Sequence, residues 1–180
     1  MQTAQEEQGF KGIESKRLAC IQMVDPIPLA VLSKDGLYRY FLSRTWDTMG
    51  KVIVIVGLNP STADASIDDP TIRRCVRFAK DWGGGSLFMV NLFAYRATDP
   101  LKLQKTTDPI GPDNDHWLAM AVDHAHLVVA AWGNRGSLFG RAADVRAKFP
   151  GKFHAISVTQ QGMPKHPLYL RADSIPRPYP

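Results

Sequence analysis

The segment KVIVIVG, residues 51–57, constrains the fold more than any other part of the chain. It is a nearly continuous run of β-branched residues that ends in glycine, and such runs are typical of parallel strands buried on both faces. A strand of this kind needs partners in its own sheet and helices on both sides. We therefore expect a layered α/β domain.

Three more apolar segments of strand length follow, and segments with helical features separate them. Residues 68–85 combine acidic capping candidates, Pro70 suited to a first turn, and terminal glycines, which indicates an amphipathic helix. The other predicted strands are 86–93, 126–133 and 152–158, and the other predicted helices lie in 111–125 and 136–151. This alternation predicts a three-layer α/β/α fold with a four-stranded parallel sheet.

The chain before residue 51 divides into two parts. Residues 1–28 start polar and end in VDPIP, whose prolines disfavour regular structure, so we expect a loose arm. Residues 29–46 alternate in LYRYFLSRTW and contain the turn Asp35-Gly36, a pattern typical of a β-hairpin. Because 180 residues suit one hydrophobic core, we expect a single domain over residues 29–180.

Composition narrows the function classes. Cys20 and Cys75 are far apart with no CxxC pair, which predicts reduced structural thiols and neither a zinc nor an iron–sulfur site. We expect no metal and no cofactor.

The start of the chain lacks a signal-peptide pattern and no apolar run approaches the roughly 20 residues that span a bilayer, so we expect a cytoplasmic protein without a membrane partner. The net charge of +5 permits attraction to nucleic acid without requiring it.

Four polar or glycine-rich segments follow the predicted strands, where ligands bind in open α/β sheets. In GLNPSTAD, Asn59 is held between Gly57 and Pro60, and its carboxamide can hold water or a substrate oxygen. Asn91 ends the second strand, where its acceptor and donors suit the edge of a base. For both asparagines, a purely structural role stays open.

The third and fourth segments offer donors for anions. WGNRG contains Asn134 and Arg135 in a glycine turn whose backbone amides can meet a phosphate, although simple turn chemistry explains it as well. In MPKHPLYLR, prolines flank His166, and a histidine on so rigid a loop is well placed to donate to a developing anion. A structural histidine is the alternative.

In this order the four segments resemble the uracil-DNA glycosylase superfamily, most closely its mismatch-specific uracil and thymine branch. GLNPS is similar to that branch's GINPG, NLFAYRATDP to the strand with the pyrimidine-reading asparagine, and KHPLYLR to the HPSPL motif. The chain also resembles a small family of uncharacterised bacterial and phage proteins that share NPSTAD, DDPTIRRC, NLFAYRAT, AAWG and HPLYL.

The resemblance implies roles for individual residues. Asn59 would position the attacking water, Asn91 would read a base flipped out of the DNA, and His166 would stabilise negative charge on the departing base. Leu170 would match the leucine wedge that fills the gap left by the flipped nucleotide. The implied DNA contacts are Lys165, Tyr169, Leu170, Arg171, Asn134 and Arg135.

Departures from the superfamily pattern bear on the substrate. Ser61 stands where the uracil-specific branch has a tyrosine that blocks 5-substituted pyrimidines, which leaves room for a larger base. The stacking aromatic is missing, and Asp64, Asp68 and Asp69 stand there as candidate base-binding residues, with helix capping as the alternative for Asp68 and Asp69. The expected substrate is a modified pyrimidine, such as a hydroxymethylated or glucosylated phage base, and its removal would act as antiviral defence.

We expect a monofunctional DNA N-glycosylase that works as a monomer on DNA. An amine at Lys165 that forms a Schiff base and nicks the abasic strand is a further possibility. Two alternatives from other classes stay open: a nucleic-acid or nucleotide binding module without hydrolysis, and a phage enzyme that tailors modified nucleotides.

Overall fold

A computed structural model of the protein describes residues 29–61, 63 and 67–180. The predicted arm over residues 1–28, with Cys20, and the candidate residue Asp64 lie outside the described residues. The strands are β1 Leu29–Leu32, β2 Arg39–Thr45, β3 Lys51–Gly57, β4 Gly84–Asn91, β5 Leu127–Ala130, β6 Phe153–Ala155 and β7 Arg177–Pro178. The α-helices are α2 Pro70–Asp81, α3 Asn114–Asp123 and α4 Arg141–Lys148, and the 3-10 helices are η1 Pro100–Gln104, η2 Asn134–Gly140 and η3 Pro167–Tyr169.

The described strands form one mixed sheet of seven strands in the order β1-β2-β4-β3-β5-β6-β7. β3 pairs in parallel with β4 and β5, and β5 pairs in parallel with β6. The predicted α/β class is confirmed, but the prediction of a sheet of four parallel strands was too narrow. The hairpin strands β1 and β2 join the same sheet through an antiparallel β2–β4 pair, and β7 extends the other edge.

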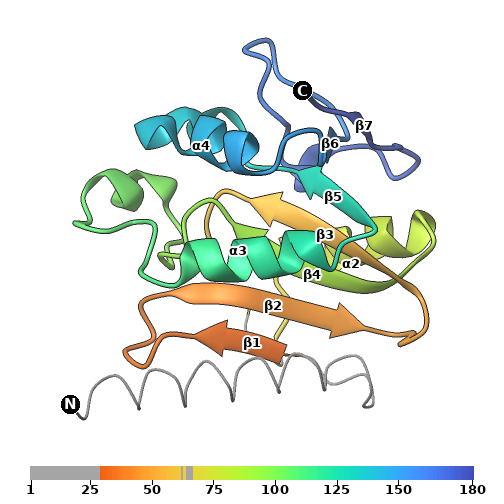
Figure 1. The fold of residues 1–180 in the computed structure, drawn as a ribbon, viewed down its shortest axis with the longest axis horizontal. Coiled ribbons are helices and arrows are strands. Elements are labelled where there is room, and N and C mark those ends of the chain that lie inside the picture. Colours follow the sequence, from red (N-terminus) through yellow and green to blue (C-terminus); the bar gives the residue numbers. More distant parts are fainter. Residues whose placement is uncertain (1–28, 62, 64–66) are drawn as a thin grey trace.

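Helices cover both faces of the sheet. Along β3, Ile53 and Ile55 pack in a cluster with Ile72, Cys75 and Ala79 of α2. The alternate residues Val54 and Val56 pack in a second cluster with residues of α3 and α4. Because side chains alternate along a strand, a continuous apolar segment such as β3 is buried on both faces. α2 therefore lies on one face, and α3 and α4 on the other (Figure 1).

The helix predicted in residues 68–85 is α2, and its start has the expected chemistry. The Asp69 carboxylate caps it by accepting a hydrogen bond from the Ile72 amide at 2.8 Å, and Pro70 occupies its first turn. The helix predicted in residues 136–151 is instead a 3-10 segment, η2, followed by the shorter α4. Phe139 and Gly140 have φ values of 54° and 72°, and these left-handed residues interrupt the helix.

Cys75 is a free thiol in the α2 cluster, where burial raises the pKa of its side chain.

Among the residues that the structure describes, no helix is long and apolar enough to cross a membrane. In the same residues, no group of three or more His, Cys, Asp or Glu side chains is arranged to hold a metal ion.

Candidate functional site

The segments that follow β3 and β4 are joined beyond the ends of both strands. Gly57 and Asn91 are partners in the parallel β3–β4 ladder. Past this pair, backbone bonds continue from Leu92 to Gly57, from Phe93 to Leu58, and from Ala97 to Pro60, at 2.9–3.0 Å. Backbone bonds therefore join the two predicted asparagine motifs at the carboxyl edge of the sheet.

Asn91 is the most unusual polar residue at this edge. Its side chain is 1% exposed, yet among the residues that the structure describes neither Oδ1 nor Nδ2 has a hydrogen-bond partner. A Cβ on Gly57 would lie 2.7 Å from Asn91 Oδ1 and 2.9 Å from Met89 Cε, so glycine makes the space that the carboxamide uses. Because buried polar groups in proteins are nearly always paired, Asn91 offers a donor and an acceptor to a partner outside the described residues.

Asn59 is half-buried, and its carboxamide has a fixed orientation. Its Nδ2 donates to the carbonyl oxygens of Pro60 at 3.0 Å and Ala97 at 2.7 Å. Since both partners can only accept, the amide nitrogen must face them, and Oδ1 is directed elsewhere as an acceptor. Asn59 thus makes the local bonds of a structural turn residue and also presents an acceptor in a set direction.

His166 is a partly buried residue whose hydrogen bond selects one tautomer. It caps η3, where Nδ1 accepts a long bond of 3.4 Å from the Leu168 amide, which leaves the proton on Nε2. Burial lowers the pKa of His166 below its ordinary value of 6.5, while the negative charge of Asp69 opposes that shift. At neutral pH the ring is therefore an uncharged donor through Nε2.

The loop with His166 is anchored to three parts of the fold. The Gly133 amide donates to the Pro164 carbonyl at 2.7 Å, and the Lys165 amide donates to Ser157 at 2.8 Å. The Arg74 guanidinium of α2 donates to the Leu170 carbonyl. These contacts place the loop beyond the ends of β5 and β6 and alongside α2.

Asn91 and His166 belong to the same face of the sheet. Met89, two residues before Asn91 on β4, packs in the α2 cluster, so the side chain of Asn91 points to the α2 face. The charge of Asp69, at the start of α2, acts on His166. Within the described residues, however, the side chains of Asn59, Asn91 and His166 do not bond one another.

The other candidate base-binding residues have different surroundings. Ser61 is half-buried and borders a cavity of about 390 Å³ between the Gly36 turn and the segment Arg96–Thr98. Asp68 forms an ion pair with Arg44 at 2.7 Å, and Asp69 caps α2. Helix capping, the structural alternative, is thus confirmed for Asp69 but not for Asp68, whose role is an ion pair with Arg44. The charge of Asp69 additionally acts on His166.

The candidate DNA contacts form an exposed rim. Lys165, Arg135 and Arg171 are exposed, and Arg171 is paired with Asp173 at 2.9 Å. Asn134 is also exposed, and its Oδ1 accepts a 2.6 Å bond from Thr159. Leu170 is half-buried, whereas Tyr169 beside it is 85% exposed, so the tyrosine is the side chain that projects farther into solvent.

Two site residues were not predicted from the sequence. Asn114 of α3 and Arg141 of α4 are buried, and both bond to backbone carbonyls at the end of β4. No sequence signal distinguishes them, because an asparagine near a helix start and an arginine in a helix are ordinarily exposed.

Comparison with known proteins identifies a family. The model of a family described as "Protein of unknown function (DUF1643)" matches residues 39–168, which include Asn59, Asn91 and His166. No curated protein matches the chain, and no solved structure matches it.

Proposed function

We propose that this chain, which belongs to the DUF1643 family of proteins of unknown function, is a monofunctional DNA N-glycosylase. It acts as a monomer in the cytoplasm, takes a flipped pyrimidine with a substituent at C5, and leaves an abasic site. The observation that carries the proposal is the buried carboxamide of Asn91, whose donor and acceptor both lack a partner within the described residues.

The edge of a pyrimidine complements that carboxamide. A pyrimidine presents one donor and one acceptor side by side, which matches the planar pair Oδ1 and Nδ2 of an asparagine. A base can reach a group this deep only after it has left the helical stack. An enzyme that flips its target base therefore fits Asn91 better than a protein that reads a closed duplex.

The other two residues supply the chemistry of hydrolysis. The Oδ1 of Asn59, oriented by the bonds from Nδ2, accepts a hydrogen bond from the attacking water and directs its oxygen to C1′ of the sugar. The water oxygen forms a bond to C1′ and releases a proton to solvent, while the bond between C1′ and the base nitrogen breaks and its electron pair leaves with the base. The Nε2–H of neutral His166 donates to the resulting anion, which then takes a proton from solvent.

The fold and the substrate form part of the same proposal. α2 on one face of the sheet and α3 and α4 on the other support a three-layer arrangement like that of the uracil-DNA glycosylase superfamily. The small Ser61 supports a substrate larger than uracil, such as a hydroxymethylated or glucosylated phage base. Removing such bases from phage DNA would serve antiviral defence.

The test is base release from synthetic DNA. Single- and double-stranded oligonucleotides that contain uracil, 5-hydroxymethyluracil or glucosylated 5-hydroxymethylcytosine are incubated with the protein, cleaved with hot alkali and checked for free base by mass spectrometry. We expect release from a 5-substituted substrate, loss of release in Asn59→Ala with DNA binding retained, and no change in Gln104→Ala, an exposed carboxamide on η1. Survival of every oligonucleotide with the unaltered protein would reject the proposal.

A second candidate is a nucleic-acid binding module without hydrolysis, or a phage enzyme that tailors a modified nucleotide with the same residues. The bonds from Asn59 Nδ2 to the loop favour this alternative, because they show that the residue has a structural role of its own. A binder would retain DNA without releasing base in either the unaltered protein or Asn59→Ala. A tailoring enzyme would change the mass of the nucleotide and leave its glycosidic bond intact.

A further inference from the structure

Behind the strand that ends in Asn91, two buried side chains bind the backbone. Nδ2 of Asn114 donates to the carbonyls of Asn91 at 3.1 Å and Leu92 at 2.9 Å. Nε of Arg141 donates to the same Leu92 carbonyl at 2.9 Å. Asn114 is fully buried and Arg141 is 3% exposed, so protein groups rather than water satisfy these carbonyls.

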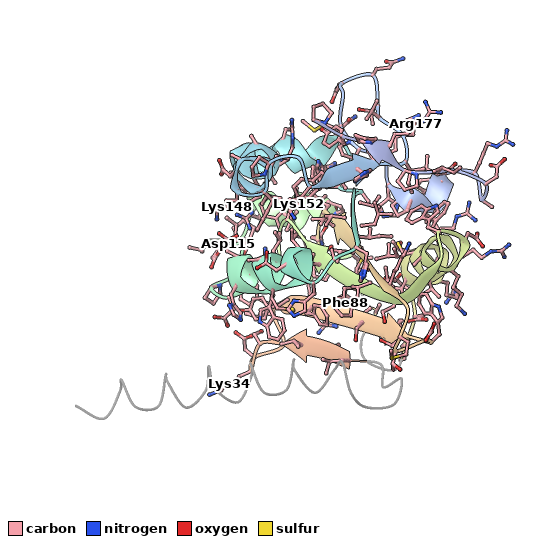
Figure 2. All side chains as sticks on the ribbon, turned by 45° about the vertical axis from the view of Figure 1, so that its right-hand side comes forward. Lys34, Phe88, Asp115, Lys148, Lys152 and Arg177 are labelled. Carbon is pink, nitrogen blue, oxygen red and sulfur yellow. The ribbon has the colours of Figure 1, made fainter. Side chains whose placement is uncertain are left out.

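Arg141 is in turn held by a partner on the neighbouring helix. Its guanidinium forms an ion pair with Asp115 of α3, and the other oxygen of Asp115 binds Lys148 of α4. Figure 2 shows Asp115 and Lys148 together at the junction of the two helices. Although burial opposes the effect, the bonds from Arg141 and Lys148 lower the pKa of Asp115, which stays ionised at neutral pH.

This placement is not explained by the stability of α4 alone. Arg141 is the first residue of α4, where a positive charge opposes the helix dipole, and a buried guanidinium also loses its hydration. A role that compensates for these costs is to fix the position of the main chain immediately after Asn91, to which Arg141 binds.

We infer that Asn114 and Arg141 are positioning residues for Asn91, because they hold the carbonyls at the end of β4 from the α3 and α4 side while the Asn91 carboxamide points to the α2 side. The inference rests on the proposed function, since it assigns these residues to the orientation of the base-reading group. They touch no ligand themselves. They hold the Asn91 carboxamide, whose side chain bonds to no other described residue, in the direction that a flipped base requires.

The test is a double-mutant cycle on base release by the full chain. Arg141→Lys and Asn114→Ala are each made alone and together with Asn91→Ala, and kcat is measured at saturating 5-hydroxymethyluracil DNA. Because small errors in the geometry of a bound group cost large factors in rate, we expect each single variant to lower kcat about tenfold. Binding of DNA should be unchanged. In the Asn91→Ala background neither change should lower kcat further.

Lys148→Ala is the matched control, because it breaks only the outer contact of Asp115 and leaves the bonds to β4. We expect it to keep its kcat. Thermal unfolding of each variant shows whether the fold is retained. A loss of kcat that is equal with and without Asn91, or no loss at all, would overturn the inference.

A different measurement separates the inference from the proposed function. If the unaltered protein releases no base, the proposed function fails, and the inference is decided by nuclear magnetic resonance of the ¹⁵N-labelled chain. The side-chain amide signal of Asn91 is assigned by its absence in Asn91→Ala. We expect it to shift or double in Arg141→Lys and to stay in place in Lys148→Ala; an unchanged signal in Arg141→Lys would refute the positioning role.

Discussion

Asn91 combines a cost to stability with a proposed role in recognition. A buried polar group without a partner costs about 1–3 kcal/mol, so Asn91→Val should raise the free energy of unfolding by about 1 kcal/mol and strongly lower kcat for base release without abolishing it. Asn59→Ala should instead lower the free energy of unfolding by about 1 kcal/mol, because two hydrogen bonds from Nδ2 are lost. Urea unfolding measures both. If Asn91→Val destabilises the protein as much as Asn59→Ala does, residue 91 is structural.

His166 sets the expected response to acid. Its folded pKa lies below 6.5. Protonation would place a proton on Nδ1, which accepts the bond from the Leu168 amide and holds the ring in place, so base release should fall only at pH values below 6.5. The same shift affects stability. Between pH 6.5 and the lower folded pKa the unfolded chain binds the proton first, so the free energy of unfolding should decrease as pH falls through this window.

Two measurements check this prediction. A pH–rate profile should show its acid limb below pH 6.5, and His166→Gln should remove the contribution of this group to the acid-dependent loss of stability. A rate that already declines above pH 6.5 would show that His166 with its lowered pKa does not set the acid limb.

At the scale of elements, the start of α2 links helix stability to the site. Asp69 caps the helix, and its charge raises the pKa of His166. Asp69→Asn keeps a good capping residue and removes the charge, so the pKa of His166 should fall further and the acid limb should move to lower pH. Asp69→Ala should in addition lower the free energy of unfolding by about 1 kcal/mol, because the capping hydrogen bond of α2 is lost. An acid limb that does not move in Asp69→Asn would exclude the electrostatic link.

The elements that could be predicted are those whose signals are local. β3 has the bounds expected from residues 51–57, because its β-branched run and final glycine are contained within it. The predicted strand 152–158 shortens to β6, Phe153–Ala155. Its partner β7 has two residues, one of them a proline, and no local sequence pattern predicts so short a strand. Left-handed Phe139 likewise could not be predicted, since a bulky residue rarely adopts that conformation.

The candidate site shows the same division. Asn59, Asn91 and His166 follow recognisable strands, so their placement at one edge of the sheet could be predicted. The roles of Asn114 and Arg141 could not be predicted, because both side chains bind main-chain carbonyls. Every residue has such a carbonyl, so no residue type in the sequence indicates these contacts. Asp68 was ambiguous from the sequence, and its ion pair with Arg44 depends on how β2 is added to the sheet.

For the molecule as a whole, the excess positive charge predicts how DNA binding responds to salt. With a net charge of +5, the logarithm of the binding constant should fall linearly with the logarithm of salt concentration. Lys165→Ala, on the exposed rim, should reduce that slope by about one. Lys51→Ala, at the amino end of β3, should leave it unchanged. Equal effects of Lys165→Ala and Lys51→Ala on the slope would indicate that DNA binds to no defined part of the protein surface.

The exposed turn at Pro150-Gly151, between α4 and β6, separates the two parts of the chain that meet in the site. A cut there would put Asn59 and Asn91 on one fragment and His166 on the other. The fragments would be rejoined through the β5–β6 ladder and the bonds from Arg74 and Trp82 to the C-terminal segment. The proposed glycosylase is thus a candidate for a split enzyme, in which the base release proposed above would report that two separately expressed fragments have associated.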